Sequence, residues 1–342
     1  MSGGDTAARP AAPTADRLEA ALAPYLRAGC LLAVSGGPDS TALMHAAAAA
    51  PHEELAVATV DHGLRPEARA EAESVAQQAK ALGLPHRILA WAGPHPRSGI
   101  QAAARAARYR LLAGHAAEIG AAFLLTAHTL DDQAETVLMR LSRGSGPSGL
   151  AGMRRERVLA PGLVLARPLL AFAKADLVAW CDAHGFAYLR DPSNADERFA
   201  RARLRRLRPL LEGEGVTAER LARLAERAAR DDDALREIAQ DALARIASED
   251  ARRLDGRALA DLPEAVGLRV LDLALAGAGG GEGRLERLER LLGEILPALR
   301  AGARLRRTFR GLLIAVEGEG TIRLTTAPPR RAPGAPELLG KG

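Results

Sequence analysis

Residues 31–41 read Leu31-Leu32-Ala33-Val34-Ser35-Gly36-Gly37-Pro38-Asp39-Ser40-Thr41, an apolar run that breaks into a glycine-containing loop and then opens a helix. Gly36 and Gly37 allow a tight turn and the close approach of a ligand, and Pro38 suits the first turn of a helix. Free backbone N–H groups at the start of a helix attract anions. The stretch therefore predicts a phosphate-binding loop. The alternative is a glycine turn that binds nothing.

This loop lacks the lysine of the Walker A motif. In that motif, GxxxxGK followed by Ser or Thr, the lysine reaches the β- and γ-phosphates, whereas no lysine follows Gly37 here. Simple hydrolysis of the γ-phosphate is therefore disfavoured. The hexapeptide SGGPDS (Ser35–Ser40) instead resembles the PP-loop of the ATP pyrophosphatases, which cleave ATP between the α- and β-phosphates to adenylate a substrate.

Length and composition favour a large globular chain. Its 342 residues are 48% hydrophobic, enough for one large domain with a buried core and a smaller second domain. Cys30 and Cys181 are the only cysteines, which excludes a disulfide framework and a CxxC metal or redox site. Met1–Pro13 has no apolar h-region, and no run approaches the roughly 18 apolar residues of a membrane span. We expect a cytoplasmic protein with no membrane partner.

The positive charge of the chain comes almost entirely from arginine. Lysine and arginine number 47 against 42 acidic residues, and the only lysines are Lys80, Lys174 and Lys341. Such an excess of arginine over lysine can simply reflect a GC-rich genome. Local clustering is more informative, because six arginines fall within eleven residues: Arg198, Arg201, Arg203, Arg205, Arg206 and Arg208. The cluster predicts a phosphate-binding surface, with a solvated helix face as the alternative.

Short apolar runs alternate with alanine-rich helical segments up to His128, which is typical of an α/β fold. The predicted strands are Leu31–Ser35, Leu55–Val60, His86–Trp91 and Ala122–Ala127, and the predicted helices are Pro38–Ala50, Pro66–Leu82 and Ile100–Ile119. Continuous apolar strands indicate a doubly wound, mainly parallel sheet covered on both faces. Ligands of such sheets bind beyond the carboxyl ends of the strands, where Ser35–Ser40, Asp61-His62-Gly63 and His128–Asp132 fall.

The remainder of the chain predicts a helical region and a short β segment. Arg143–Gly149 reads as a flexible or tightly turning loop, followed by a strand-like pair ending at Pro168 and a helix over Lys174–His184. Beyond a hinge at Gly213–Gly215, heptad-like leucines and alanines predict helices, and Leu305–Leu324 predicts two strands. The expected organisation is a disordered N-terminus over 1–18, a catalytic domain over 19–212, a helical domain over 217–300, a β segment over 301–326 and a disordered tail over 327–342.

Acidic residues follow the last predicted strand of the first domain. His128-Thr129-Leu130-Asp131-Asp132-Gln133-Ala134-Glu135-Thr136 enters a helix in which Asp132 and Glu135 share a face. Helix capping explains acids at such a position equally well. Beside a nucleotide loop, however, paired carboxylates can also bind Mg²⁺ or a cationic amine.

Two further groups of polar residues are weaker candidates. His62 lies where an adenine or a ribose would bind, although a lone histidine is more often structural. The helix beginning near Ile100 places Arg105, Arg108 and Tyr109 on one side, where they could meet a triphosphate or RNA. Ordinary surface arginines are the alternative there.

In order along the chain, several motifs resemble those of the tRNA(Ile)-lysidine synthetase family. They are SGGPDST, VDHGLR, GIQAAARAARY, TAHTLDDQAET, RGSGPSGLAGM, RPLL and DPSNADERFARARLR, and the resemblance covers about Leu31 to Leu211. The pairing of HxxDDxxET with RGSGPxGL is highly specific. One departure is the pair Arg201-Ala202, where the family often has Arg-Asn. The C-terminal part is shorter than in the longer members.

The resemblance implies a fold and a reaction. It implies the PP-loop ATPase (adenine nucleotide alpha hydrolase-like) fold with a C-terminal helical domain. The implied enzyme is a ligase that forms a C–N bond: ATP adenylates carbon 2 of the wobble cytidine in tRNA(Ile) with a CAU anticodon, and the ε-amine of L-lysine then displaces AMP. A poor leaving group, the cytosine carbonyl oxygen, must be activated before an amine replaces it.

The resemblance also assigns residues. It implies catalytic roles for Asp39, Asp132 and Glu135, with the last two binding the lysine substrate and Asp39 associated with Mg²⁺. It implies tRNA contacts at Arg108, Arg201 and Arg205. For ATP it implies Ser35, Gly36, Gly37, Pro38, Asp39, Ser40, Asp61, His62, Arg105 and His128. A homodimer is compatible with the sequence.

Three other functions fit parts of the sequence. A tRNA thiolase of the same fold needs cysteines to carry sulfur or an iron–sulfur cluster, and two isolated cysteines do not supply the usual set. A GMP- or NAD-synthetase-like enzyme needs neither the Arg198–Arg208 cluster nor a helical appendage. An RNA-binding protein with a degenerate nucleotide site is a third alternative.

Overall fold

The computed structural model describes residues 14–63, 67–92, 96, 99–189, 200–248 and 252–328, with backbone alone at 200–202. The chain divides into two compact units, with the main boundary between Glu226 and Arg227. The second unit also includes the short segment Ser145–Ser148. Nothing in the described ranges combines the length and the apolar composition of a membrane-crossing helix.

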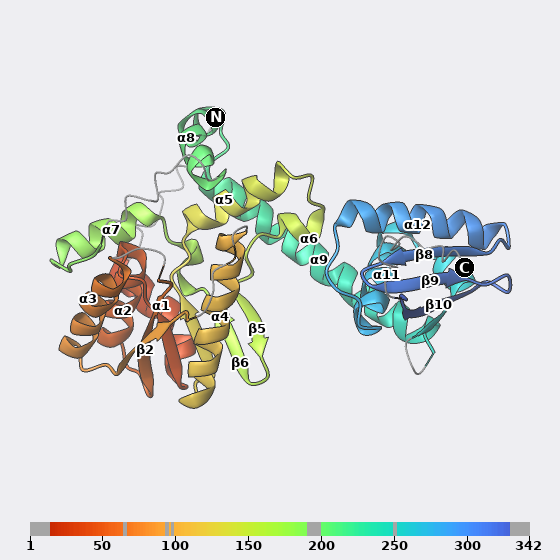
Figure 1. Cartoon of the computed structure of the whole chain (residues 1–342). Coiled ribbons are helices and arrows are strands. Elements are labelled where there is room, and N and C mark those ends of the chain that lie inside the picture. The colour runs from red at the N-terminus through yellow and green to blue at the C-terminus, as the bar shows by residue number, and fades with distance from the viewer. Residues whose placement is uncertain are drawn as a thin grey trace, which may run out of the picture. The chain divides into compact units, whose positions relative to one another are not determined.

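The first unit is built on a six-stranded sheet of order β3-β2-β1-β4-β6-β5 (Figure 1). All neighbouring strands are parallel except β5 and β6, which are antiparallel. The strands are β1 Cys30–Ala33, β2 Leu55–Asp61, β3 His86–Ala90, β4 Phe123–Thr126, β5 Glu156–Ala160 and β6 Leu163–Ala166. The predicted α/β class with a mainly parallel sheet is confirmed.

The strand order reverses between β1 and β4. The chain proceeds from β1 outward to β2 and β3, and then crosses back to β4 on the other side of β1. In doubly wound sheets, the crevice at this reversal, beyond the carboxyl ends of the strands, is where ligands bind. The fold therefore brings the loop after β1 and the loop after β4 to one place.

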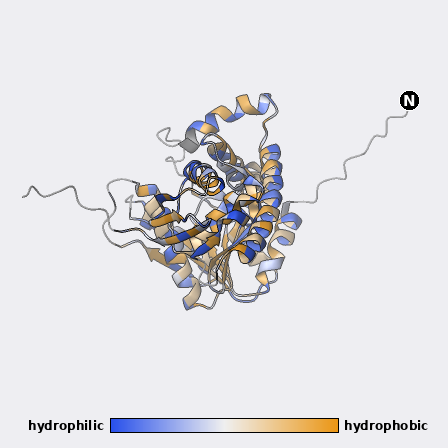
Figure 2. Ribbon diagram, turned by 90° about the vertical axis from the view of Figure 1, so that its right-hand side faces the viewer, coloured by the Kyte–Doolittle hydropathy of each residue, from blue (hydrophilic) through white to orange (hydrophobic). Residues whose placement is uncertain are grey.

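Helices cover both faces of the sheet. They are α1 Thr14–Leu26, α2 Pro38–Ala49, α3 Ala68–Ala81, α4 Ile100–Glu118, α5 Leu130–Leu141, α6 Pro147–Leu150, the 3-10 helix η1 Pro168–Ala171, α7 Lys174–Ala183 and α8 Ala200–Gly213. Successive strand residues point to opposite faces: Leu32 packs in one core with α1, α2, α3 and α7, and Leu31 packs in the other with α4. Figure 2 shows hydrophobic colours along strands and alternating colours along helices.

Helix α1 differs from the expected disordered N-terminus of residues 1–18. It begins at Thr14. Leu18, Leu22 and Leu26 recur at helical spacing on its buried face, and each is at most 1% exposed. The first thirteen residues lie outside the described part of the chain. A second difference is the short helix α6, which falls within and just after the predicted loop Arg143–Gly149.

The second unit combines helices with a four-stranded antiparallel sheet of order β7-β10-β9-β8. Its elements are the C-terminal part of α9 Ala218–Ile246, β7 Arg253–Asp255, α10 Gly256–Ala260, α11 Glu264–Gly277, α12 Leu285–Arg300, β8 Leu305–Phe309, β9 Leu312–Val316 and β10 Thr321–Thr326. Leu271, Ile295, Ile314 and Ile322 share one buried core. The predicted helical and β segments thus form a single unit.

Two sequence predictions for this region are wrong in detail. Three strands, not two, occupy residues 305–326, because positive φ angles at Arg310 and Gly311 close one tight turn and Gly320 ends the next. The unit boundary also does not lie at residues 212–217. The start of α9 packs through Leu221 and Ala225 against α5, so it belongs to the first unit.

Candidate active site

The predicted PP-loop connects β1 to α2, and its conformation requires glycine at Gly36. That residue has a φ of +86°, and a Cβ there would lie 2.6 Å from Leu189 Cδ1. The backbone N–H of Leu189 donates to the Gly36 carbonyl at 2.8 Å, which holds the two segments together. Gly37 is the N-cap of α2 with an ordinary φ of −69°, and Pro38 follows as the first helical residue. The N-terminus of α2 therefore lies directly at the loop, so its free backbone N–H groups are next to it.

Hydroxyl groups hold the loop in shape. Ser40 Oγ accepts from the Ser35 N–H at 3.2 Å and donates to the Gly37 carbonyl at 3.0 Å. Thr41 Oγ1 donates to the Gly36 carbonyl at 3.3 Å. These bonds bring the predicted nucleotide residues of the loop together as one preformed cradle, with N–H groups at a helix start available for an anion.

Asp39, the second residue of α2, contacts a lysine that the sequence analysis did not assign. Lys174 Nζ lies 2.9 Å from Asp39 Oδ2, and the Asp39 side chain is only 18% exposed. Burial raises the pKa of Asp39, Lys174 opposes that rise, and the carboxylates of Asp132 and Asp131 add to it. The Lys174 backbone N–H also donates to Asp131 Oδ2, so the loops after β1 and β4 converge on this one lysine.

Asp131 and Asp132 act on different partners. Asp131 Oδ2 accepts the Lys174 backbone N–H at 2.7 Å and Oδ1 accepts from Arg208. Burial alone would raise the pKa of Asp131, but these two donors outweigh burial and lower it. Asp132 forms a capping box with Thr129: the Thr129 N–H donates to Asp132 Oδ2 at 3.0 Å, and the Asp132 N–H donates to Thr129 Oγ1 at 3.3 Å.

Glu135 lies one turn further along α5 and pairs with Arg205 of α8. The distances are 2.5 Å from Arg205 Nε to Glu135 Oε1 and 3.2 Å from Nη2 to Oε2. Burial lowers the pKa of Arg205, but the hydrogen bond and charge of Glu135 raise it overall. The structure thus joins a predicted lysine-binding residue to a predicted tRNA-binding residue. The Arg201 side chain lies outside the described residues, as does that of Arg198.

The remaining predicted nucleotide residues stand at the ends of neighbouring strands. Asp61 Oδ1 accepts the Gly63 N–H at 2.9 Å, and the His62 ring meets Trp91 edge-on at 6.2 Å. His128, after β4, has its Nδ1 2.9 Å from Thr126 Oγ1. These local contacts fix side chains at the carboxyl edge of the sheet.

Arginines of α4 lack carboxylate partners within the described ranges. The Arg105 guanidinium lies over the Tyr109 ring at 5.1 Å from its centroid. Burial and the nearby Arg105 lower the pKa of half-buried Arg108, with Tyr109 opposing. An uncompensated, partly desolvated cation favours an anionic ligand, which is consistent with the phosphate contacts predicted for this helix.

Mg²⁺ fits this site as an ion bound partly by its substrate. Asp39 Oδ1 is buried and has no hydrogen-bond partner, so one carboxylate oxygen is available to a cation. Across the described residues, no group of three or more His, Cys, Asp or Glu side chains is arranged to hold a metal. Mg²⁺ commonly binds through one or two carboxylates plus substrate phosphates, and Asp39 suits that arrangement.

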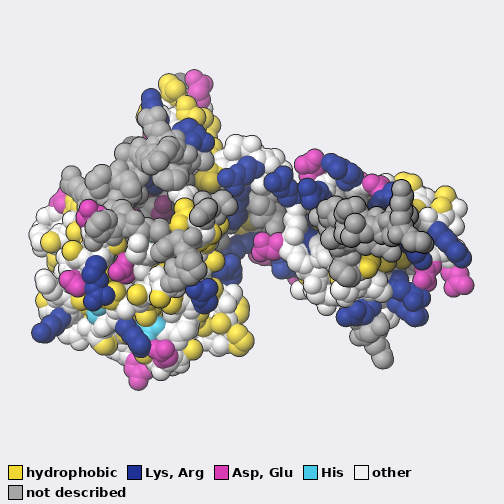
Figure 3. All heavy atoms as spheres, viewed as in Figure 1, with side chains coloured by type: hydrophobic (Ala, Val, Ile, Leu, Met, Phe, Trp, Pro, Cys, Tyr) yellow, Lys and Arg dark blue, Asp and Glu magenta, His cyan; other side chains and the backbone are white. Residues whose placement is uncertain are grey.

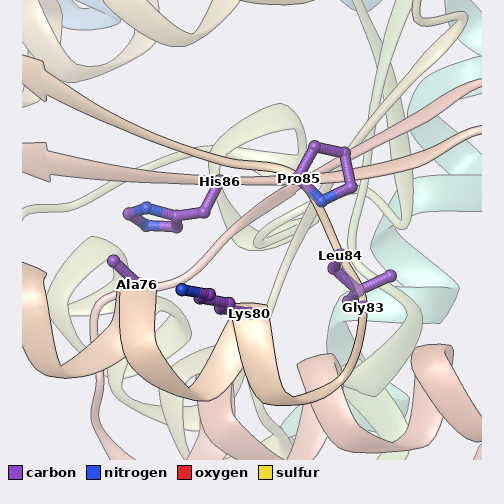
Figure 4. A pocket seen from close by; sticks show the side chains of 6 residues that line it. All are labelled: Ala76, Lys80, Gly83, Leu84, Pro85 and His86. Atoms are coloured by element: carbon purple, nitrogen blue, oxygen red, sulfur yellow. The ribbon is translucent and has the colours of Figure 1, made fainter.

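A surface hollow of about 570 Å³ lies elsewhere. It is lined by Ala76, Lys80, Gly83, Leu84, Pro85 and His86, at the turn from α3 into the edge strand β3 (Figure 4). It is broad and open, and it does not include the PP-loop. Both cysteines are buried thiols: burial raises the pKa of Cys30 to about 12 and, with nearby acids, that of Cys181 to about 11.

Comparison with known proteins agrees with this architecture. The PP-loop domain family matches residues 10–211. The solved structure of the U34-tRNA thiolase NcsA from Methanococcus maripaludis matches with a TM-score of 0.54 at 17% identity, covering 63% of this chain and 79% of that one. At that identity the match supports the fold alone.

Two curated relatives are far more similar. The tRNA(Ile)-lysidine synthase of Methylobacterium nodulans is 59% identical over 93% of this chain and 96% of its own length. That of Rhodopseudomonas palustris is 49% identical over 88% and 91%. With nearly full-length similarity and a preformed PP-loop at the sheet reversal, this chain belongs to the tRNA(Ile)-lysidine synthase family of ligases.

Proposed function

We propose that this protein joins L-lysine to carbon 2 of the wobble cytidine in tRNA(Ile) with a CAU anticodon, using ATP and Mg²⁺. The observation that carries the proposal is the convergence of a preformed PP-loop with the acidic start of α5, where Asp131 and Asp132 act electrostatically on Asp39. Relatives named tRNA(Ile)-lysidine synthase that align over nearly the whole chain support the same substrates.

The first step of the proposed reaction activates the cytidine. Its carbonyl oxygen O2 attacks the α-phosphorus of ATP, the bond from that phosphorus to the bridging oxygen breaks, and pyrophosphate leaves with the bonding electrons. Backbone N–H groups of the PP-loop would hold the phosphates. Asp39 Oδ1, which has no hydrogen-bond partner, would bind a Mg²⁺ ion that offsets their negative charge. Asp61, His62, Arg105 and His128 provide the remaining nucleotide contacts.

The second step replaces AMP with lysine. The bound ε-ammonium first loses a proton to solvent. The neutral amine then attacks carbon 2, the carbon–oxygen bond to the adenylate breaks with its electrons leaving on AMP, and a second proton passes from the new nitrogen to solvent. Glu135 and Asp132 attract the incoming ammonium. The bonds that Asp132 makes with Thr129 use only Oδ2, so capping the helix is compatible with a second contact through Oδ1.

Binding of the tRNA depends on arginine. Arg108, Arg201 and Arg205 are proposed to contact RNA near the reacting cytidine, which must leave its stack to be read. The second unit carries further exposed arginines: Arg284, Arg287, Arg290, Arg300, Arg304, Arg306 and Arg307. Figure 3 shows many dark blue Lys and Arg side chains on the surface of the protein. Such a surface suits phosphate contacts along the tRNA.

The test is a labelling experiment with total tRNA. The protein is incubated with ATP, Mg²⁺ and radiolabelled lysine, the tRNA is digested, and the labelled nucleoside is identified. We expect lysine on cytidine, stoichiometric release of AMP and pyrophosphate, and no label when ATP is omitted. Label on another nucleoside, sulfur transfer, or ATP cleavage without tRNA modification would contradict the proposal.

A further inference from the structure

A lysine reaches the PP-loop from a distant part of the chain. Lys174, the first residue of α7, places its Nζ 2.9 Å from Asp39 Oδ2 although 135 residues separate them. Asp39 is the second residue of α2, so the ammonium group lies beside the helical turn whose N–H groups form the anion site. Its side chain is 46% exposed, which leaves it accessible to a ligand.

Backbone contacts, rather than the ion pair with Asp39, fix the position of Lys174. Its own N–H donates to Asp131 Oδ2 at 2.7 Å, and the carbonyl of Phe172 accepts the Leu130 N–H at 2.9 Å. Helix α7 also packs on α2, with Cys181 Sγ donating to the Pro38 carbonyl at 3.6 Å. The main chain is therefore anchored to both loops of the site, while the long side chain can turn from Asp39 to another anion.

A purely structural ion pair explains this contact poorly. Partly exposed pairs contribute only about 0–1 kcal/mol to stability, and this one leaves Asp39 Oδ1 buried without a partner. The first turn of α2 is suited to anions, and Asp39 places its own carboxylate there. This carboxylate keeps the Lys174 ammonium at the anion site when no phosphate is bound. Arrival of a phosphate chain with its cation would satisfy both side chains at once, Asp39 through the cation and Lys174 through the phosphate.

The other cations nearby have different partners or places. Arg205 pairs with Glu135, and Arg208 pairs with Asp131 and Glu212. Lys80 lies at the hollow beside β3 (Figure 4). Among the described residues, Lys174 is the only lysine in contact with a PP-loop residue.

We propose that Lys174 binds the β- and γ-phosphates of ATP, in the role that Walker A loops give to a lysine inside the motif. The inference rests on the proposed function in taking ATP as the substrate. When the bond between the α-phosphorus and the bridging oxygen breaks, negative charge accumulates on pyrophosphate, and the Lys174 ammonium offsets it without gaining or losing a proton.

The experiment compares ATP with AMP, which lacks the two phosphates in question. Binding of each nucleotide to the full-length protein, with Mg²⁺ and without tRNA or lysine, is measured by calorimetry for wild type, Lys174→Met, Lys174→Arg and the control Lys80→Met. We expect Lys174→Met to weaken ATP binding by about tenfold or more and AMP binding by less than about twofold. Lys174→Arg should recover part of the loss, and Lys80→Met should match wild type.

Thermal unfolding of the same variants shows whether each is folded. Equal ATP affinity of Lys174→Met and wild type would overturn the inference, as would equal weakening of ATP and AMP. These results are separable from the proposed function. If the wild type forms lysidine but Lys174→Met binds ATP normally, the inference about Lys174 is wrong and the proposed function stands. If ATP binding depends on Lys174 but the protein modifies no tRNA, the proposed function is wrong and the inference about Lys174 stands.

Discussion

The Arg205 guanidinium holds the Glu135 carboxylate at two points, with Nε to Oε1 at 2.5 Å and Nη2 to Oε2 at 3.2 Å. Glu135 is 7% exposed, whereas Arg205 is 38% exposed. The carboxylate proposed to attract the substrate ammonium is thus already paired with a cation. Exchange of the guanidinium for an ammonium keeps the charge of this nearly buried site balanced, which avoids the cost of an unpaired buried acid.

Glu135→Gln should therefore impair the lysine step selectively. Removal of the negative charge takes away the attraction for the ammonium, while the PP-loop is untouched. We expect the KM for lysine to rise about tenfold or more, with adenylated tRNA still formed when lysine is withheld. Steady-state kinetics over a lysine titration and detection of the adenylate by nuclease digestion provide the measurement.

Thr129→Ala is the matched control for Glu135→Gln. It removes the capping box at the start of the same helix and should cost about 1 kcal/mol of unfolding free energy. Because both carboxylates remain, it should change the KM for lysine far less than Glu135→Gln does. A Glu135→Gln variant that behaves like Thr129→Ala, less stable but normal in its use of lysine, would assign Glu135 a structural role only.

Asp39→Asn should separate chemistry from folding. Burial raises the pKa of Asp39, so the charged carboxylate is less favourable in the folded than in the unfolded chain, and a neutral amide should not lower the melting temperature. Loss of the negative charge at the phosphate site should reduce adenylation by a factor of roughly 10² or more. Rates of pyrophosphate release and a thermal melt test both expectations. Asp176→Asn, at an exposed position of α7, is the control and should leave both unchanged.

Much of this site could be predicted from local sequence. The β1–α2 unit combines a continuous apolar run, two glycines and a proline, and the structure places strand, loop and helix within two residues of the predicted bounds. Strands β1, β2 and β4 are equally well predicted, because strands in the middle of a covered parallel sheet are mostly apolar. The edge strand β3 is less buried but still carries the apolar pair Ile88-Leu89.

The parts that local sequence could not predict depend on long-range contacts. Lys174 is the first residue of an ordinary helix, and only its contact with Asp39, 135 residues away, indicates a role at the PP-loop. The sequence did hold one clue to that role, because the loop has no lysine of its own and lysine is scarce in the chain. Arg205 and Glu135 are 70 residues apart. Helix α1 follows a Gly/Ala/Pro-rich stretch that obscures its start, and the three-residue strand β7 is too short to show a period.

Gly36→Ala should disrupt the loop, whereas Gly37→Ala should spare its fold. At Gly36 the φ of +86° strains any other residue, and the new Cβ would meet Leu189 Cδ1 at 2.6 Å. A loss of about 1–3 kcal/mol is expected from denaturant unfolding, together with loss of ATP binding. At Gly37 the nearest atom to an added Cβ is Ser35 Oγ at 3.9 Å. Equal stability of the two variants would contradict this assignment.

The cysteines should be inert in the native protein. Since burial raises the pKa of Cys30 to about 12 and that of Cys181 to about 11, neither forms the reactive thiolate at about pH 8. We expect a thiol reagent to label none in native protein and both in denaturant. In the unfolded chain the Cys30 thiol ionises near pH 9, whereas in the folded chain it ionises only near pH 12. The free energy of unfolding should therefore fall as the pH rises from 9 toward 12. Rapid native labelling would reopen a sulfur-transfer function.

Removal of the second unit should lower the affinity for tRNA and make that affinity less dependent on salt. Where the chain is truncated decides whether the first unit stays folded. A chain ending at Gly215 loses Leu221 and Ala225, which cover Leu130, Ala134 and Val137 of α5, and we expect it to unfold at lower temperature and to bind ATP poorly. A chain ending at Glu226 keeps that packing and should bind ATP like wild type.

Filter binding of tRNA at several salt concentrations then tests what the second unit contributes. Each arginine–phosphate contact releases counterions, so the Glu226 truncation should bind tRNA more weakly and with a shallower dependence of log affinity on log salt than the full chain. Because its PP-loop and α5 remain intact, calorimetry with ATP shows that the loss is specific to RNA. If affinity and salt slope equal those of the full chain, the first unit recognises tRNA unaided, and the arginines of the second unit serve another partner.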